Sequence, residues 1–260
     1  MNYVPYDFIS AKMSDAQKEK ARSEMPGLKG LFCYVFPYFS GFAPGNISLY
    51  ARGRDYHLVL RKLLQEKIEE LKKAFPEGHF RAYADVSPFP EVYAAAASGL
   101  GVIGKNGLLI TGEYGSFVFI GTVATDVEAP AKIEVKSCIL CGKCQSVCTA
   151  LSDKGVCLSK CVSELTQRKG ELTREQSELV AKSQTAWGCD LCQLCCPMNE
   201  GIKHTEIRDF CEDLLCSFPE LPESNREFQK IYSDRAFIWR GMAPIKRNLE
   251  LQKEQKIIKK

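Results

Sequence analysis

The sequence Cys138-Ile-Leu-Cys141-Gly-Lys-Cys144-Gln-Ser-Val-Cys148 opens the segment that decides how this chain folds. Two residues separate each of the first three cysteines, and three residues separate the third from the fourth. At this spacing three close thiolates bind one iron–sulfur cubane, while the fourth reaches across to a second cubane. The segment continues to Pro197 and holds ten of the 13 cysteines. It therefore predicts a pair of [4Fe–4S] clusters.

A second run of cysteines closes the same segment. Within it, Cys189-x2-Cys192-x3-Cys196-Pro197 matches the last three cysteines and the proline of a bacterial ferredoxin motif. The first cysteine of that motif is missing locally, so we expect Cys161 to fold back and supply the ligand, with Cys157 as the alternative. Cys195 is then a spare thiol. The predicted ligands of this ferredoxin-like domain are Cys138, Cys141, Cys144 and Cys196 for one cluster, and Cys148, Cys161, Cys189 and Cys192 for the other.

Three other interpretations of the cysteines stay open. A different pairing uses Cys189, Cys192 and Cys195 as the close thiolates, but its fourth ligand would directly follow the third, and adjacent side chains point apart. Two structural zinc sites are the second alternative, although zinc normally takes two separated Cys-x2-Cys pairs. Disulfides are the third. Because no charged and apolar leader opens the sequence, we expect a reducing, cytoplasmic setting instead.

The composition is that of an ordinary globular protein. The 260 residues carry a net charge of +3, and 45% of them are hydrophobic. No apolar run is long enough to cross a bilayer, so we expect no membrane partner. The C-terminal end is basic and could bind phosphates or form a solvated helix end. Its basic residues are Arg235, Arg240, Lys246, Arg247, Lys253, Lys256, Lys259 and Lys260.

Hydrophobic periodicity predicts structure on both sides of the cysteine segment. Helices are expected over 14–24, 55–75, 91–99, 173–185 and 206–218. Strands are expected over 28–39, 80–84, 108–111 and 116–125. Cys33 lies in the first strand and is expected in the core. The fold class is therefore α+β, with an α/β domain over residues 1–130, a double-cluster domain over 131–203 and a helical C-terminal segment with a basic tail over 204–260.

Cationic and polar residues gather before the long helix over 55–75. Arg52, Arg54 and His57 lie at its N-terminal end, where exposed N–H groups favour an anion such as phosphate. The alternative is that Asp55 caps the helix and the arginines are solvated. Composition alone does not separate these two interpretations.

Asp85 follows the strand over 80–84 and enters a proline-rich turn. An acid at the end of a strand beside a ligand cleft is a common position for a general acid. Aspartate is also simply a good turn residue. The sequence around Asp85 leaves both roles open.

A glycine-rich run, Gly99-Leu-Gly-Val-Ile-Gly104-Lys-Asn-Gly107, follows the helix over 91–99. It contains Gly-x-Gly-x-x-Gly, but it follows a helix and leads into a strand, so it lacks the context of a dinucleotide site. A close approach of the backbone to a large planar ligand is the expected use of these glycines.

Taken together, several stretches resemble the epoxyqueuosine reductase family, in the same order along the chain. The Cys161-Val-Ser-x-Leu-Thr166 segment resembles that family's isolated cluster cysteine. The other stretches are Leu49-Tyr-Ala-Arg-Gly-Arg-Asp-Tyr-His57, Asp85-x2-Pro88-x2-Glu91, Gly99-Leu-Gly-x2-Gly-Lys-Asn106 and Gly188-Cys-Asp-x-Cys-Gln-x2-Cys-Pro-x-Asn199. The resemblance runs from about Met25 to about Asn248.

The resemblance implies a cobalamin-dependent reductase that removes the epoxide oxygen of epoxyqueuosine in tRNA, the last step of queuosine biosynthesis. It implies two [4Fe–4S] clusters, a nitroreductase-like cobalamin domain, a flavodoxin or ferredoxin as electron donor, and a monomer. Asp85 matches the proton donor, while Arg52, Arg54 and His57 would face the cofactor or the tRNA. The implied cofactor-binding residues are Asp85, Gly101, Gly104, Lys105, Asn106, Leu109 and Ile110.

Some features depart from the family. Its members usually have a longer N-terminal region and a C-terminal helical-repeat domain that helps to hold tRNA, so we expect a short form. Thr149 replaces a usual proline, and the stretch from Gly107 to Gly115 also resembles reductive dehalogenases. Two alternatives therefore remain: a related corrinoid and iron–sulfur reductase acting on a small molecule, and a ferredoxin-type electron carrier that is not an enzyme.

Overall fold

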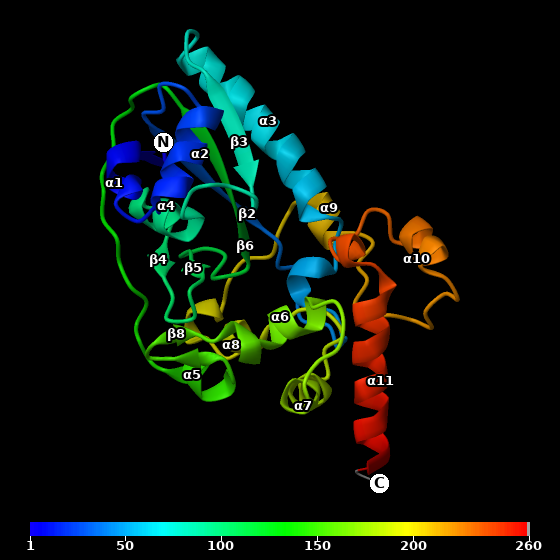
Figure 1. Ribbon diagram of the computed structural model, residues 1–260. Coiled ribbons are helices and arrows are strands. Elements are labelled where there is room, and N and C mark those ends of the chain that lie inside the picture. Colours follow the sequence, from blue (N-terminus) through cyan, green and yellow to red (C-terminus); the bar gives the residue numbers. More distant parts are fainter. Residues whose placement is uncertain (259–260) are drawn as a thin grey trace. The chain divides into compact units, whose positions relative to one another are not determined.

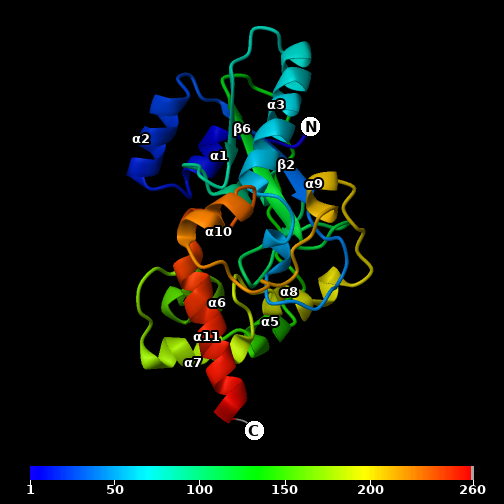
Figure 2. The same ribbon diagram turned by 90° about the vertical axis from the view of Figure 1, so that its right-hand side faces the viewer.

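The computed structural model describes residues 1–258, with side chains up to residue 255. Lys259 and Lys260 of the predicted basic tail therefore lie outside the described residues, as does the side chain of Lys256. The chain forms two compact units, each assembled from segments far apart in the sequence (Figures 1 and 2). The first comprises Met1–Pro37, His57–Cys141 and Glu200–Lys203, and the second comprises Tyr38–Tyr56, Gly142–Asn199 and the residues from His204 onward.

A four-stranded antiparallel sheet forms the centre of the first unit, in the order β1-β2-β6-β3. The strands β2 (Gly30–Pro37), β3 (Phe80–Ala84) and β6 (Val118–Thr125) confirm three of the predicted strands. The edge strand β1 (Tyr3–Pro5) was not predicted, because three residues are too few to show a periodic pattern.

Helices cover both faces of this sheet. The helix α3 (Tyr56–Ala74) lies along one face, as the predicted helix over 55–75 requires (Figures 1 and 2). Gly121 of β6 lets α3 approach closely, since a Cβ there would lie 2.8 Å from the Leu64 side chain. The opposite face is covered by α1 (Tyr6–Ser10), α2 (Asp15–Glu24) and α4 (Glu91–Ala97).

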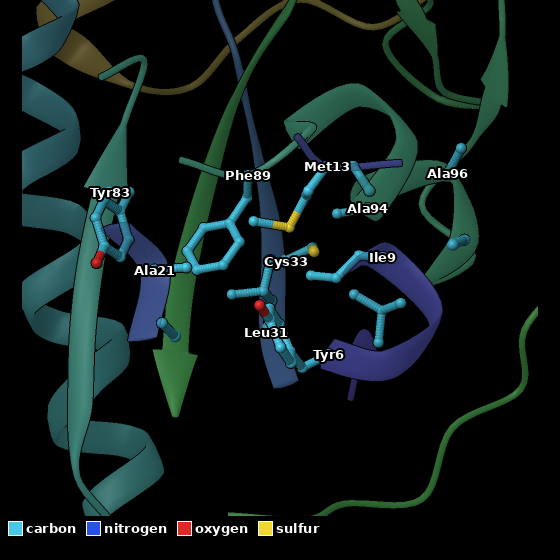
Figure 3. Close-up of a cluster of buried hydrophobic side chains, with 14 of the residues drawn as sticks. Tyr6, Ile9, Met13, Ala21, Leu31, Cys33, Tyr83, Phe89, Ala94 and Ala96 are labelled. Atoms are coloured by element: carbon cyan, nitrogen blue, oxygen red, sulfur yellow. The ribbon is translucent and has the colours of Figure 1, made fainter. Parts of the chain in front are cut away.

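Cys33 lies in the hydrophobic core between the sheet and these shorter helices, as predicted. Figure 3 shows its sulfur among the side chains of Ile9, Met13 and Phe89. Burial raises the pKa of the Cys33 thiol to about 12, so it stays protonated at neutral pH. The thiol fills space in the core, and the four alanines of α4 allow that helix to pack close to the sheet.

The second unit is built mainly from helices. These are α5 (Lys143–Val147), α6 (Val162–Gln167), α7 (Arg174–Ser183), α8 (Leu191–Leu194), α10 (Asn225–Ile231) and α11 (Met242–Ile258), with the two-residue strands β7 (Leu151–Ser152) and β8 (Gly155–Val156). Helix α5 packs against α8, and α11 packs against α6 and α7. The predicted helix over 173–185 is confirmed as α7, whose N-cap is Thr173.

A second hydrophobic core holds this unit together. Trp187, Phe228, Phe237 and Ile245 are its largest fully buried side chains, together with Ile47. Within residues 1–258, none of the helices is long and apolar enough to cross a bilayer.

The prediction of a helix over 206–218 is wrong. Only Arg208–Cys211 is helical (α9). The chain is extended at Glu212 and left-handed at Asp213, where φ is 53°. Cys211 and Cys216 therefore do not share a helix.

Tertiary hydrogen bonds explain this difference. The backbone N–H of Leu215 donates to the carbonyl oxygen of Arg52, and the carbonyl oxygen of Cys216 accepts from Ile47. The side chain of Arg235 donates to the carbonyl oxygen of Asp213 at 2.8 Å. These bonds satisfy backbone groups that a helix would otherwise have paired, so a local amphipathic pattern is overridden.

Candidate functional site

Three of the predicted cluster ligands converge in the second unit. Cys148 follows α5, Cys161 precedes α6 and Cys189 precedes α8. The pKa of the Cys189 thiol is raised to about 11, mainly by burial and to a smaller extent by the charges of Asp190, Cys148 and Cys161, while a backbone hydrogen bond from Leu191 opposes the rise. Cys189 therefore lies close to two thiols that are distant in the sequence. The fourth predicted ligand, Cys192, lies on α8.

These thiols have the chemistry that an iron–sulfur cluster requires. Thiolates are soft ligands and suit iron–sulfur clusters and zinc. In the part of the chain that the structure describes, no three His, Cys, Asp or Glu side chains are grouped closely enough to hold one metal ion. One zinc ion would need all of its sulfurs about 2.3 Å from one point. Each iron of a cubane takes its own thiolate, so a cubane fits a wider group of convergent thiols.

Cys157 and Cys195 are the two cysteines that the preferred pairing leaves out. Cys157 is exposed, and its sulfur lies 3.1 Å from the hydroxyl oxygen of Ser159. The Cys195 thiol donates to the carbonyl oxygen of Cys192 at 3.6 Å. The proximity of Cys161 to Cys189 supports Cys161 as the distant ligand, and that assignment stays a prediction.

The loop that carries Cys189 is held by the stretch before α3. The Ser48 hydroxyl and the Leu49 backbone N–H both donate to the carboxylate of Asp190. Gly188 has a φ of 75°, and a Cβ there would lie 2.4 Å from that of Ser48. Two of the stretches that resemble the family, the one that ends at His57 and the one that starts at Gly188, therefore meet at this loop.

The other ligand set is divided between the two units. Cys138 and Cys141 belong to the first unit, and Cys144 and Cys196 belong to the second. Within the first unit, the backbone N–H of Lys105 donates to the sulfur of Cys138 at 3.3 Å. Hydrogen bonds to cluster sulfurs influence the reduction potential. The glycine-rich segment is thus physically joined to a predicted cluster ligand.

This glycine-rich segment forms a short hairpin of β4 (Val102–Ile103) and β5 (Leu109–Ile110). A Cβ at Gly101 would lie 2.4 Å from the carbonyl oxygen of Ile110, and one at Gly104 would lie 2.3 Å from the side-chain oxygen of Asn106. The backbone contact within the hairpin therefore already requires Gly101, whereas the contact at Gly104 is with a side chain that could move. Leu109 and Ile110 are buried, and a ligand contact of this segment stays a prediction.

Asp85 lies directly after β3 in a left-handed conformation, with a φ of 67°. This conformation is uncommon for a residue other than glycine, and strained residues gather at functional sites. Nε2 of His57 on α3 lies 3.3 Å from the Asp85 carboxylate. An acid and an imidazole are therefore paired at the end of this strand.

Glu91, at the start of α4, is a second acid near Asp85. One of its carboxyl oxygens is buried and, within residues 1–258, has no hydrogen-bond partner. Its pKa is raised to about 8, mainly by burial and also by the charge of Asp85, while a hydrogen bond with Ser87 opposes the rise. Glu91 is therefore largely protonated at neutral pH and can hold a proton close to Asp85.

The predicted anion site is not assembled from Arg52 and Arg54. Arg52 is buried, and its guanidinium donates to the carbonyl oxygens of Ile47 and Ala43. Arg54 forms an ion pair with Asp209 at 3.1 Å. Both arginines thus hold the second unit together, while His57 belongs to the first unit and faces Asp85.

Neither Glu91 nor Asp190 is a predicted functional residue, although both occur in the quoted motifs. A signal for Glu91 is present, because the four alanines that follow it indicate a helix packed tightly on the sheet, which buries its first turn. Asp190 has no comparable signal, since its partners Ser48 and Leu49 lie far away in the sequence.

Comparisons with known proteins agree with these observations. A family model described as "Epoxyqueuosine reductase QueG, DUF1730" matches residues 18–86. The epoxyqueuosine reductase of Lactococcus garvieae is 35% identical over 224 residues, which cover 82% of this chain and 62% of that protein. The one from Synechocystis sp. is 31% identical over 219 residues, covering 79% and 75% respectively.

Solved structures of epoxyqueuosine reductases share the fold. One, in complex with an epoxyqueuosine-modified tRNA-Tyr stem loop, has a TM-score of 0.80 at 24% identity and covers 96% of this chain and 76% of that chain. Another, from Bacillus subtilis, has its catalytic aspartate loop swung out of the active site. It has a TM-score of 0.77 at 27% identity and covers 94% and 69% respectively.

Proposed function

Because this chain belongs to the epoxyqueuosine reductase family, we propose that it is an oxidoreductase that reduces epoxyqueuosine to queuosine in tRNA. The chain spans 62% of the Lactococcus garvieae relative and 75% of the Synechocystis one, so the activity of the longer proteins is carried over as a proposal. The observation that carries it is Asp85, which lies at the end of β3 beside His57. The related enzyme from Bacillus subtilis has a catalytic loop named for its aspartate, and a strained aspartate after a strand suits that role.

The cysteines would hold two [4Fe–4S] clusters in a ferredoxin-like arrangement. The convergence of Cys148, Cys161 and Cys189 supports one ligand set, which Cys192 completes. The Lys105 N–H group beside Cys138 supports a cluster next to the glycine hairpin. A flavodoxin or a ferredoxin in the cytoplasm would supply electrons to these clusters, and we expect the protein to act as a monomer.

The first unit would bind cobalamin in a nitroreductase-like manner, with the segment from Gly101 to Ile110 beside it. When bound, the reduced corrinoid would supply the electrons for cleavage of the epoxide. The support from this chain is a hairpin whose tip residue Lys105 contacts Cys138, so electrons leaving a cluster there would have a short path.

The residues of the chain would supply the protons. Removing an epoxide oxygen as water, with formation of a C=C bond, uses two electrons and two protons. The Asp85 carboxyl would donate a proton to the oxygen as the C–O bond breaks, and His57 would orient that carboxyl. Glu91 is protonated at neutral pH and would return a proton to Asp85 for the second transfer.

Turnover of a defined RNA tests the proposal. Anaerobically reconstituted protein would be mixed with cobalamin, a strong reductant and a stem-loop RNA that carries epoxyqueuosine. Digestion and mass spectrometry should reveal queuosine, which lacks one oxygen. Complete reduction of cobalamin without any queuosine would reject this substrate and leave the class of reductase in place.

A further inference from the structure

The second unit contains a cavity that the proposed reaction does not use. Its volume is about 440 Å³, which is in the range of sites for small molecules. The walls come from α10, the start of α11, the turn between them and the segment before α7. The lining includes Lys169, Gly170, Trp239, Arg240 and Arg247. We call this cavity the Trp239 groove.

The lining of the Trp239 groove is cationic. It includes Lys169, Arg240 and Arg247 and no aspartate or glutamate. Arg247 donates to the carbonyl oxygens of Leu165 and Gly170, so its charge is fixed in the wall. Three positive charges without a carboxylate favour an anionic ligand.

An exposed aromatic ring is the second feature of the groove. The Trp239 side chain is 57% exposed, which is unusual for so large an apolar group. The guanidinium carbon of Arg240 lies 3.8 Å from the centre of the Trp239 ring, a close cation–π contact. A flat exposed indole suits stacking of a planar group such as a nucleobase.

Arg240 also carries a donor without an acceptor. Its Nε is buried and, among the described residues, has no hydrogen-bond partner. A buried donor left unpaired is destabilising, so an oxygen atom of a ligand that accepts from it would be favoured. Arginine binds phosphate especially well because its planar donors match the phosphate oxygens.

We propose that the Trp239 groove binds one nucleotide of the substrate RNA, outside the nucleoside that reacts. Lys169 and Arg240 contact its phosphate, and Trp239 stacks on its base. This inference rests on the proposed function, because it assigns a docking site to the same tRNA. It also gives the basic C-terminal end a specific role: Arg240 contacts RNA, whereas Arg235 and Arg247 bind backbone carbonyl oxygens of the chain itself.

RNA binding by reconstituted protein tests the groove. The chain has two tryptophans, and the other, Trp187, is buried. An unmodified anticodon stem-loop RNA should therefore quench Trp239 fluorescence, and Trp239→Phe should remove that quenching with little loss of affinity. Trp239→Ala should weaken binding about tenfold. Lys169→Gln should lower the slope of log Kd against log salt by about one, while Lys230→Gln, an exposed control on α10, should leave it unchanged.

The outcomes separate this inference from the proposed function. If wild-type protein binds the RNA and both Trp239→Ala and Lys169→Gln bind it equally well, the Trp239 groove is not an RNA site and the proposed function stands. If wild-type protein shows no salt-sensitive RNA binding, the tRNA substrate itself is wrong. Thermal melting of each variant shows that it is folded, since both changed side chains are exposed.

Discussion

Asp85 and Glu91 are two carboxyl groups with different surroundings. Asp85 is exposed at the end of β3 and lies beside His57, whereas Glu91 is largely buried at the start of α4. The sequence predicts the position of Asp85, because a strand pattern ends there. It does not reveal the partner of Asp85, since His57 comes from another element, nor the left-handed backbone at this residue.

Replacing Asp85 by asparagine should remove the proton donor and keep the shape of the site. We expect turnover of epoxyqueuosine-containing RNA to fall by about 10²- to 10⁴-fold, with unchanged iron content and RNA affinity. Asp126→Asn is the matched control, because Asp126 also pairs with a histidine, His79, at 2.7 Å. Full activity of Asp85→Asn would remove this residue from the mechanism.

Glu91 should make the stability of the protein depend on pH. Its ordinary pKa is 4.5, and the folded protein raises it to about 8, so between these values only the unfolded chain loses the proton. The contribution of Glu91 to the free energy of unfolding is therefore largest below pH 4.5 and decreases as the pH rises to about 8. The groups that face Glu91 are Asp85 and Ser87 on the preceding loop and Cys33 on β2.

Glu91→Gln should remove this dependence on pH. Its melting temperature relative to wild type should be higher at pH 8.5 than at pH 5 by on the order of 5 °C. The exposed Glu77→Gln serves as the control and should keep the same difference from wild type at both pH values. An equally constant difference for Glu91→Gln would mean that Glu91 is ionised in the folded protein.

Among elements, regular patterns were reliable where an element is regular over several residues and buries at least one face. The helix α3 and the strands β2, β3 and β6 occur where their periodicity predicts them, because α3 packs on the sheet and the strands form it. The segment over 206–218 has a helical pattern but is mostly not helical, because its backbone forms hydrogen bonds with Arg52, Asn46 and Arg235. Such partners are distant in the sequence and cannot be read from it.

The helix α11 should stabilise the second unit through one buried amide. Asn248 is fully buried and donates to the carbonyl oxygens of Thr166 and Ala186. Asn248→Ala leaves both carbonyls without a donor and should lower the free energy of unfolding by about 2 kcal/mol. Denaturant titration of reconstituted protein measures this change, and Glu250→Ala on the exposed side of α11 should have little effect. Equal stability of the two variants would contradict the role of Asn248.

At the scale of the whole molecule, the sequence predicts paired clusters but does not predict how the chain is divided into compact units. Cysteine spacing indicates paired clusters, since spacing restricts which thiolates can share a cubane. The two compact units are each made of three separate segments, and a boundary falls between Cys141 and Gly142, inside the first cysteine run. The predicted domains over 1–130 and 131–203 are continuous stretches. The division into units made of separate segments depends on long-range contacts, which the sequence does not reveal.

The central claim is that thiolates distant along the chain bind two cubanes, and that Cys161 is one of them. The most direct measurement is the iron content of anaerobically reconstituted wild type, Cys161→Ala and Cys195→Ala. We expect about eight iron atoms per chain in wild type and in Cys195→Ala, and about four in Cys161→Ala. Colourless wild-type protein that contains zinc in place of iron, or a loss of iron in Cys195→Ala with none in Cys161→Ala, would contradict the account.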